Sequence, residues 1–376
     1  MEAPFKEKKL FTPGPLCCSR SVKEAMLVDV GSRDSYFISC VKEIRQRLLE
    51  IAQLSESEYT AVPLQGSGTY CVEAVLQTTS PRQGAKVLIL ANGAYGRRMG
   101  QMCEWAGLEM RLEEFPEEQR LDLAKVETIL RSDSFSTVAV VHCETSTGII
   151  NPVEDVARLV TSLQPGAAMV VDAMSSFGAV PLEVSGSGID YVVSSANKCL
   201  EGVPGFSFAI CRTKHLLSCK GNCRVLSLDL VDQHLALDRS GQFRFTPPTH
   251  SMLAFRQALR EYASSGGLAG RASRYKENRR ILREGMKRLG FRELLKEEDA
   301  GYIITSFRFP EHERFDFQVF YSKLSEKGQV IYPGKVSSAN CFRVGNIGHL
   351  FPKDMTTFLG CLEDVMREVG LPVPLS

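Results

Sequence analysis

The stretch AMVVDAMSSFGAVPLEVSGSGIDYVVSSANKCLEGVPGFSFAIC at Ala168–Cys211 determines the fold of this 376-residue chain. It contains three short apolar runs, at Ala168–Asp172, Tyr191–Ser194 and Phe206–Cys211. Runs of this length that are apolar on both faces predict strands buried in a sheet that is covered on both sides. Small polar residues, glycine and proline lie between the runs, which predicts connecting loops at the ends of the strands.

The sequence before this stretch alternates between similar strands and amphipathic helices. Two further buried strands are predicted at Lys86–Leu90 and Thr137–His142. The predicted helices are Val41–Leu54, Gly96–Ala106, Leu121–Leu130 and Val153–Leu163. Because buried strands alternate with helices, the predicted fold class is α/β, with a mostly parallel sheet and helices on both of its faces.

From about Phe255 the pattern changes to charged helices and short strands, which favours a smaller α+β domain. The predicted elements are helices at Phe255–Ala263, Tyr275–Leu289, Phe317–Lys327 and Asp354–Val369, and strands at Tyr302–Phe309, Val330–Tyr332 and Phe342–Val344. We therefore predict a large domain over residues 1–257, whose N-terminal segment can contribute to an active site. A small C-terminal domain would cover residues 258–376, with the boundary inside a long helix.

Composition and charge exclude several classes of protein. The chain has 45 basic and 44 acidic residues and a formal net charge of +1, so no nucleic-acid or membrane-surface partner is expected. Its 12 cysteines form no CxxC pair and its 6 histidines form no HExxH pair, which predicts reduced thiols and no metal site. Met1–Leu10 lacks the apolar stretch of a signal peptide, and no segment predicts a membrane span. We expect a cytoplasmic protein, with a mitochondrial form as the alternative.

Gln65–Thr69 (QGSGT), which precedes a helical pattern, has the residues of a phosphate-binding loop. Ser67 and Thr69 supply hydroxyl donors, Gly68 allows a close approach of the backbone, and the start of a helix favours an anion. The stretch matches neither the Rossmann fingerprint nor the P-loop. Because similar turns are common in loops that bind nothing, the motif alone leaves both interpretations open.

Two ionisable residues follow the buried strands of the opening stretch. Asp172 ends the first strand, at the edge where open α/β sheets bind ligands. Its carboxylate could hold a protonated pyridine nitrogen, or simply cap the turn that follows. Lys198 follows the second strand, where desolvation should lower its pKa and favour the free amine that Schiff-base chemistry needs. The alternative is a solvated surface lysine, against which the Gly/Pro turn after Lys198 argues.

Arg343 lies on a predicted strand, in CFRVG at Cys341–Gly345. A charged group on an apolar strand is costly unless it has a partner. Arg343 therefore either meets a buried carboxylate or serves as a planar fork for an anionic substrate.

Seven motifs are spread over almost the whole chain. They are TPGP at Thr12–Pro15, QGSGTY at Gln65–Tyr70, NGAYGRR at Asn92–Arg98, HCETSTGIINP at His142–Pro152, VVDAMSSFG at Val170–Gly178, SANKCLEGVPGF at Ser195–Phe206 and FRVGNIG at Phe342–Gly348. In sequence and order they resemble the class V aminotransferases, which implies a pyridoxal 5′-phosphate (PLP) cofactor and the aspartate-aminotransferase-like fold known as PLP fold type I. GSRD at Gly31–Asp34 resembles the branch that transfers the amino group of 2-aminoethylphosphonate to pyruvate, in phosphonate catabolism.

The resemblance also implies a role for individual residues in a homodimer with shared active sites. Lys198 would form the Schiff base with PLP and act as general acid and base, and Asp172 would pair with the pyridinium nitrogen. The other cofactor contacts would be Ser67, Gly68 and Thr69 at the phosphate, Tyr95 on the ring face, Thr145 at the ring side, Asn197 beside the lysine, and Thr246 reaching the partner's phosphate. The substrate would contact Arg343, with Ser19 and Arg33 as further donors.

Three other functions are compatible with parts of the same sequence pattern. Alanine–glyoxylate or serine–pyruvate transamination uses the same cofactor residues and stays open. Cysteine desulfurases of the same class carry histidines where this chain has Tyr95 and Asn197, so that branch is disfavoured. A catalytically silent binding protein on the same fold would have lost a catalytic residue, whereas Lys198 and Asp172 are both present.

Overall fold

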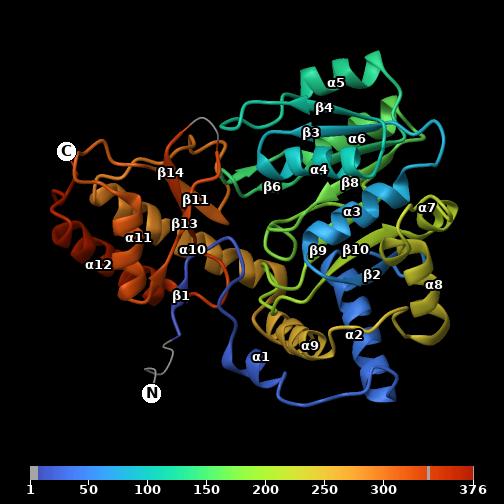
Figure 1. Cartoon of the computed structure of the whole chain (residues 1–376), viewed down its shortest axis with the longest axis horizontal. Coiled ribbons are helices and arrows are strands. Elements are labelled where there is room, and N and C mark those ends of the chain that lie inside the picture. Colours follow the sequence, from blue (N-terminus) through green and yellow to red (C-terminus); the bar gives the residue numbers. More distant parts are fainter. Residues whose placement is uncertain (1–6, 337–338, 376) are drawn as a thin grey trace.

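A central seven-stranded sheet organises the chain, seen in Figure 1 with helices around it. The computed structural model describes residues 7–336 and 339–375. The first six residues of Met1–Leu10, the segment without the apolar stretch of a signal peptide, lie outside the described residues. The strand order is β2-β10-β9-β8-β5-β3-β4. The strands are β2 (Tyr59–Gln65), β3 (Val87–Ala91), β4 (Met110–Glu114), β5 (Thr137–Val141), β8 (Ala168–Asp172), β9 (Tyr191–Ser195) and β10 (Phe206–Arg212).

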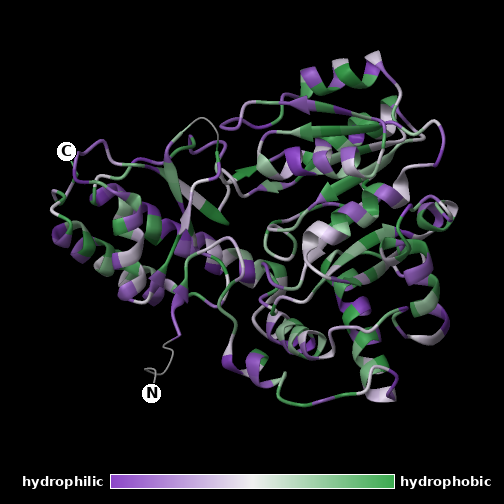
Figure 2. Cartoon of the chain, in the orientation of Figure 1, coloured by the Kyte–Doolittle hydropathy of each residue, from purple (hydrophilic) through white to green (hydrophobic). Residues whose placement is uncertain are grey.

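All pairings in this sheet are parallel except those of β10, which runs antiparallel to β2 and β9. The predicted mostly parallel sheet is therefore confirmed. Every residue of the central strands β3, β5, β8 and β9 is buried, because helices cover both faces of the sheet. Figure 2 shows the hydrophobic residues concentrated on these strands and the polar residues on the outer sides of the helices.

The helices around this sheet include the predicted ones, of which α6 has the predicted bounds, and also α8, which was not predicted. They are α2 (Ser35–Ile51), α3 (Gly68–Thr79), α4 (Ala94–Trp105), α5 (Leu123–Ser132), α6 (Val153–Leu163), α8 (Leu230–Ser240) and α9 (Thr249–Ser264). α2 begins earlier than predicted because the Asp34 side chain accepts a hydrogen bond from the Tyr36 backbone N–H and caps the helix. No helix within residues 7–336 and 339–375 is long and apolar enough to cross a membrane.

The sequence pattern did not predict the two edge strands of the sheet. β2 contains Pro63, which cannot donate to a strand ladder and is tolerated here because β2 lies at the edge. β4 reads Met-Arg-Leu-Glu-Glu and is only partly buried, so it has no apolar run to recognise. Charged residues on an edge strand also discourage pairing with another chain.

The C-terminal region forms a second, smaller α+β layer, as predicted. A three-stranded sheet of order β11-β14-β13 packs with long helices and has its own phenylalanine-rich core. Its elements are α10 (Gly267–Arg288), β11 (Ile304–Arg308), α11 (Phe317–Glu326), β12 (Gln329–Val330), β13 (Tyr332–Pro333), β14 (Cys341–Gly345) and α12 (Pro352–Glu368). The proposed boundary between residues 257 and 258 falls inside α9 and stays a proposal.

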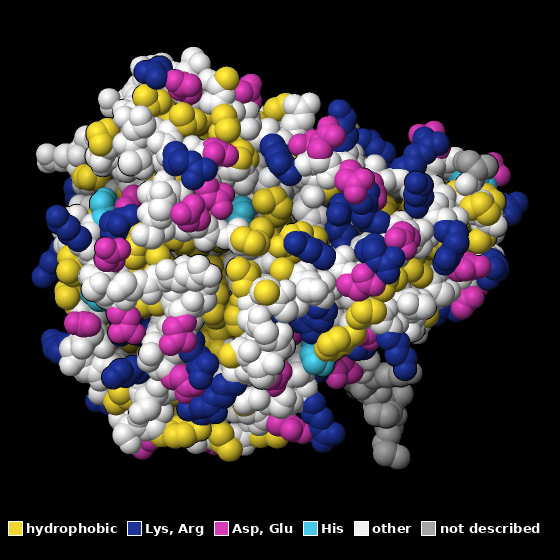
Figure 3. Space-filling model, turned by 180° about the vertical axis from the view of Figure 1, so that it is seen from behind, with side chains coloured by type: hydrophobic (Ala, Val, Ile, Leu, Met, Phe, Trp, Pro, Cys, Tyr) yellow, Lys and Arg dark blue, Asp and Glu magenta, His cyan; other side chains and the backbone are white. Residues whose placement is uncertain are grey.

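The N-terminal segment joins this C-terminal layer. Strand β1 (Lys9–Leu10) pairs in parallel with β12, and Phe11 is buried in the second core. The chain then runs toward α1 (Arg20–Glu24), as Figure 1 shows. On the outside of the molecule, Figure 3 shows basic and acidic side chains interspersed over one face, in keeping with the near-zero net charge.

Candidate active site

A cavity of about 200 Å³ lies at the carboxyl ends of β8 and β9. This is the edge at which parallel sheets bind ligands. Seven residues selected from the sequence line it: Ser67, Gly68, Thr69, Tyr95, Asp172, Asn197 and Lys198. The fold therefore brings together groups that are far apart in the chain.

Lys198 lies just beyond the end of β9, with its side chain directed into this cavity. Its Nζ donates a hydrogen bond to the Pro13 carbonyl oxygen at 2.7 Å. Burial lowers the pKa of Lys198 from its usual 10.5, and the positive charge of Arg343 lowers it further. A larger fraction of the amine is therefore unprotonated and nucleophilic at neutral pH.

Gly14 leaves the space that the Lys198 side chain occupies. A Cβ at Gly14 would lie 2.6 Å from Lys198 Nζ and 2.8 Å from its Cδ, and the backbone φ of +127° disfavours a side chain. The Thr12–Pro15 turn therefore packs directly on the Lys198 side chain.

We expect Gly14→Ala to displace Lys198 and lower kcat/KM by about 10²-fold, since misplacing a catalytic group by about 1 Å can have that effect. Steady-state kinetics check this result. Gly84→Ala is the matched control, because Gly84 also has a positive φ, of +66°, and no neighbouring atom within 4 Å of an added Cβ. Equal activity of the two variants would show that the Gly14 contact does not position Lys198.

A buried ionic cluster holds the chain immediately after Lys198. Glu201 has a positive φ of 59° and forms an ion pair of 2.8 Å with Arg271 of α10. The Glu201 carboxylate also accepts a 2.6 Å hydrogen bond from Tyr275 OH, which in turn accepts one from the Gly348 backbone N–H. The lysine loop is thus tied to the helix and the loop of the C-terminal layer. Glu201 belongs to the motif SANKCLEGVPGF, but the sequence does not indicate its partners, which only the fold shows.

Asp172 ends β8 and is almost fully buried. One carboxylate oxygen accepts a hydrogen bond of 2.9 Å from the Met174 backbone N–H. Burial raises the pKa of Asp172 from 3.8 to about 6, and the nearby charge of Glu144 raises it as well, whereas Lys198 and the Met174 hydrogen bond lower it. The carboxylate is therefore costly to ionise alone and favours a cationic partner in the cavity.

Glu144 fixes the start of α4, where Tyr95 lies. Its Oε2 accepts a hydrogen bond from the Tyr95 backbone N–H at 3.2 Å, and its Oε1 accepts one from Ser146 Oγ at 2.6 Å. A Cβ at Gly93 would lie 2.4 Å from the Glu144 carboxyl carbon, so only glycine fits there. The Tyr95 ring is thereby held at the cavity wall.

The predicted phosphate loop leads into α3. Ser67 is the N-cap residue, yet its hydroxyl makes no capping hydrogen bond, so it is free for a ligand. A Cβ at Gly68 would lie 2.1 Å from Met174 Cε, which explains the glycine by close packing. The first N–H groups of α3, with Ser67 and Thr69, form an anion site of the predicted kind.

Arg98 lines the same cavity, although it was not selected from the sequence. Its Nη1 donates to Thr69 Oγ1 at 3.5 Å, and its guanidinium lies 5.0 Å from the centroid of the Tyr95 ring. Because Arg98 is three residues after Tyr95 on α4, both side chains share one face of the helix. The three-residue spacing between Tyr95 and Arg98 was the sequence signal that could have identified Arg98. The Arg98 side chain places a positive charge beside the phosphate loop.

Arg343 is buried on β14 next to the cavity and close to Thr145. Arg343 Nε donates a hydrogen bond to the Pro333 carbonyl, and Arg343 Nη1 donates one to the Thr145 carbonyl, each at 2.9 Å. No carboxylate in residues 7–336 and 339–375 forms an ion pair with Arg343. Among these residues, therefore, Arg343 is not the partner of a buried carboxylate. The fork for an anionic substrate is the interpretation that is left.

Three other predicted residues do not line the cavity. Ser19 caps α1, accepting from the Val22 backbone N–H at 3.2 Å and donating to Glu261 at 3.1 Å. Arg33 is exposed just before α2. Thr246 is exposed in the loop between α8 and α9, and its carbonyl accepts a hydrogen bond from the Gln65 side chain at 3.0 Å. Their roles stay predictions.

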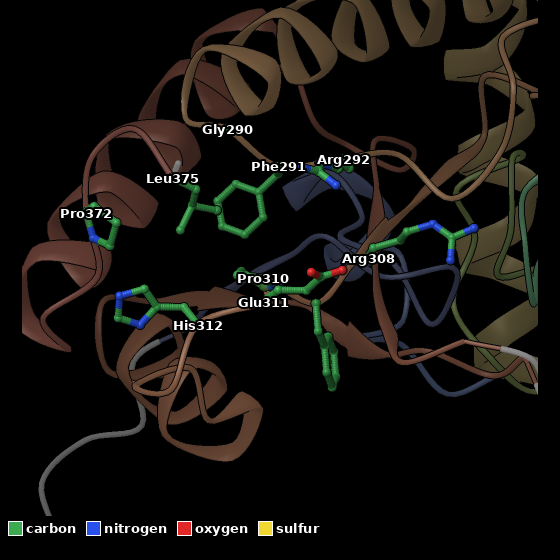
Figure 4. Close-up of a pocket in the computed structure, with 10 residues that line it drawn as sticks. Gly290, Phe291, Arg292, Arg308, Pro310, Glu311, His312, Pro372 and Leu375 are labelled. Atoms are coloured by element: carbon green, nitrogen blue, oxygen red, sulfur yellow. The ribbon is translucent and has the colours of Figure 1, made fainter.

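A second cavity, of about 150 Å³, lies in the C-terminal layer (Figure 4). Its walls combine apolar side chains, among them Phe291, Pro372 and Leu375, with the charged or polar side chains of Arg292, Arg308, Glu311 and His312. None of the residues selected from the sequence lines it, and no lysine is among its lining residues. We therefore assign the site to the cavity around Lys198.

The sequence of the chain matches a known family over most of its length. Residues 23–344 match the family described as Aminotransferase class-V. The chain is 48% identical to a 2-aminoethylphosphonate–pyruvate transaminase of Phocaeicola vulgatus, with 95% of this chain and 99% of that protein covered. It is 49% identical to the protein of the same name from Klebsiella pneumoniae, with coverage of 95% and 97%.

Solved structures show the same fold at lower sequence identity. The ureidoglycine–glyoxylate aminotransferase of Bacillus subtilis superposes with a TM-score of 0.89 at 22% identity, covering 99% of this chain and 96% of that one. An alanine–glyoxylate aminotransferase from Nostoc sp. superposes with a TM-score of 0.88 at 26% identity, covering 98% and 97%. The fold predicted from the motifs is thereby confirmed.

Proposed function

The chain belongs to the class V aminotransferase family, and we propose that it transfers the amino group of 2-aminoethylphosphonate to pyruvate. The products are phosphonoacetaldehyde and alanine. The cofactor of this PLP-dependent aminotransferase is pyridoxal 5′-phosphate. The observation that carries the proposal is one cavity that unites Lys198, Asp172 and the phosphate loop, beside an arginine without a described counter-ion.

The residues around the cavity fit this cofactor. The start of α3, with the free Ser67 hydroxyl and nearby Arg98, suits a phosphate. Asp172 suits a protonated ring nitrogen, because its buried carboxylate gains from a cationic partner. Lys198 suits covalent attachment, and Tyr95 offers an aromatic wall. When bound, PLP supplies the electron sink that makes the amino-bearing carbon of the substrate acidic.

Lys198 performs the proton transfers in this proposal. Its neutral Nζ removes the proton from the amino-bearing carbon of the donor, and the resulting ammonium returns a proton during amino transfer. Burial favours the neutral amine that starts the reaction, since it lowers the pKa of Lys198. Asp172, in its ionised form, would hold the protonated ring nitrogen, and Arg343 would orient the acidic end of the substrate. Donor and acceptor use the same residues in turn, which predicts ping-pong kinetics.

A panel of half-reactions tests the choice of substrate. The PLP form is offered 2-aminoethylphosphonate, alanine, serine and taurine in turn, and conversion to the pyridoxamine form is followed by absorbance. We expect 2-aminoethylphosphonate to have the highest kcat/KM, because a phosphonate offers more charge and more acceptor oxygens than a carboxylate.

The similarity to the alanine–glyoxylate aminotransferase from Nostoc sp. supports a second candidate. That enzyme class transfers an amino group between two carboxylate substrates, which Arg343 could orient equally well. If alanine with glyoxylate exceeds 2-aminoethylphosphonate with pyruvate by more than about tenfold in kcat/KM, this second candidate replaces the first.

We also propose that the enzyme is a cytoplasmic homodimer with shared active sites. The exposed Thr246 loop is tied to the residue before the phosphate loop, since Gln65 donates to the carbonyls of Phe245 and Thr246. Exposed apolar side chains lie on neighbouring elements, with Leu226 at 74%, Tyr70 at 54% and Phe245 at 44% exposure. Such a patch is typical of a protein interface.

If Thr246 reaches the phosphate in a partner subunit, PLP should strengthen association by linkage. We expect sedimentation velocity to show a dimer that dissociates at higher protein concentration without PLP than with it. Thr246→Ala should weaken this effect of PLP, while Thr249→Ala, at the start of α9, should not. A fully active monomer at assay concentration would contradict the shared site.

A further inference from the structure

The loop between β13 and β14 brings a lysine to the Tyr95 wall of the cavity. Lys335 Nζ lies 4.7 Å from the centroid of the Tyr95 ring. The Lys335 side chain is exposed, and no carboxylate in the described ranges 7–336 and 339–375 forms an ion pair with it. Its positive charge therefore stands uncompensated at the rim of the candidate active site.

The same loop is bonded to Arg343. Tyr332 of β13 pairs with Arg343 of β14, and the Pro333 carbonyl accepts the hydrogen bond from Arg343 Nε. The Gly334 backbone N–H donates to the Cys341 carbonyl at 2.8 Å, which closes the start of the loop. Lys335 follows Gly334 directly, so one strand pair holds both cations close to Tyr95, at the edge of the cavity.

The charges around Tyr95 show that these cations converge. Burial raises the pKa of Tyr95, but the positive charges of Lys198, Lys335 and Arg343, together with a hydrogen bond to the Thr145 side chain, outweigh it, so the pKa falls below its usual 10. The nearby carboxylates have other partners: Asp172 accepts a hydrogen bond from the Met174 backbone N–H, and Glu144 accepts one from the Tyr95 backbone N–H. The substrate side of the cavity thus has more positive charge than a monoanion needs.

The two proposed substrates differ in charge at their acidic end. A carboxylate has one negative charge and two oxygens, whereas a phosphonate has up to two charges and three oxygens. Arg343 can satisfy one charge with its planar fork and serve either anion. A second charge needs a second cation, and lysine is a compact point charge on a flexible stem that can reach it.

We propose that Lys335 pairs with the phosphonate of the amino donor as the second cation of the substrate site, and so sets the preference for phosphonate over carboxylate. This inference rests on the proposed function and names a specificity residue for it. Lys335 contacts the donor but not pyruvate or alanine, for which Arg343 alone is sufficient.

Binding of non-reacting anions tests the inference without turnover. Ethylphosphonate and propionate, which carry the two acidic groups without an amine, are titrated calorimetrically into the PLP-loaded protein at pH 8. For Lys335→Gln we expect the Kd of ethylphosphonate to rise about tenfold, the range of a lost charge-assisted hydrogen bond, and that of propionate less than about threefold. Lys335→Arg should keep most of the affinity for ethylphosphonate.

A matched control separates this role from a general loss of surface charge. Lys276 Nζ lies 5.1 Å from the centroid of the Tyr302 ring, which is the same kind of contact outside the cavity. Lys276→Gln should leave both dissociation constants unchanged. In the half-reactions, Lys335→Gln should lower kcat/KM about tenfold for 2-aminoethylphosphonate and less than about threefold for alanine.

The outcomes distinguish the two proposals. If the wild type reacts with 2-aminoethylphosphonate and Lys335→Gln binds both anions normally, the Lys335 inference is wrong and the proposed function stands. An equal loss for both anions also overturns it, since Lys335 would then serve any anion. If the wild type does not react with 2-aminoethylphosphonate, the proposed function itself fails.

Discussion

We expect Lys198→Ala to abolish transamination, with a loss of at least about 10⁴-fold in rate. The substitution removes at once the amine that attaches PLP and the group that acts as general acid and base. Lys198 is the only lysine among the residues that line the cavity. Borohydride reduction followed by mass spectrometry should find PLP covalently attached to the wild type and absent from the variant. Retained attachment in the variant would show that another lysine carries the cofactor.

The fold of this variant should survive. Burial depresses the pKa of Lys198, so in the cofactor-free protein a protonated Lys198 destabilises the folded state, and stability rises with pH as the amine loses its proton. Alanine removes that cost, together with the hydrogen bond to Pro13. We expect the Tm of the cofactor-free variant at pH 7 to equal or exceed that of the wild type. Lys276→Ala on α10 should keep full activity.

Asp172→Asn slows the half-reaction by about 10²–10³-fold, the range for loss of one preorganised electrostatic contact. Asparagine keeps the shape of the side chain and an oxygen that can accept the Met174 hydrogen bond, but it has no charge for the ring nitrogen. Affinity for PLP should fall less than about tenfold, because the phosphate and covalent contacts remain. Single-turnover kinetics and a PLP titration measure the two effects. Near-normal turnover would mean that Asp172 only caps the turn.

The pH dependence of stability gives an independent test of the buried charge. The folded pKa of Asp172, about 6, lies above its usual 3.8, so the folded cofactor-free protein loses stability as the pH rises through this interval. The Asn variant has no such loss. In the cofactor-free form it should therefore unfold at a higher temperature than the wild type at pH 8, and the difference should shrink toward pH 4.

The centre of the fold and of the site could be predicted from the sequence. β8 is confirmed at Ala168–Asp172, and β9 and β10 differ from their predictions by one residue at their ends. Fully buried strands give continuous apolar runs, so their ends, and with them Asp172 and Lys198, are visible in a single sequence. Edge strands and helix starts depend on tertiary surroundings and caps, which is why β2 and the first residues of α2 were missed.

The partners of the site residues could not be predicted in this way. Arg98 becomes a cavity residue only because α4 turns its Tyr95 face toward Thr69. Lys335 is far from Tyr95 in the sequence, and no local sequence pattern indicates that the two side chains lie close together in the fold. Thr145 was selected by resemblance for its hydroxyl, and that role stays a prediction; the structure adds that the Thr145 carbonyl accepts a hydrogen bond from Arg343.

The pairing of β1 with β12 has a consequence for how the protein is made. β1 is synthesised before the central sheet and its partner strand β12 after it, so Leu10 and Phe11 lack their native contacts while the sheet is being made. Contacts between such distant segments form late, and exposed apolar residues invite aggregation meanwhile. Pro13, whose carbonyl accepts the Lys198 hydrogen bond, lies three residues after the end of β1. The nascent chain can therefore build the central sheet early, but it completes the surroundings of Lys198 only after β12 has been made.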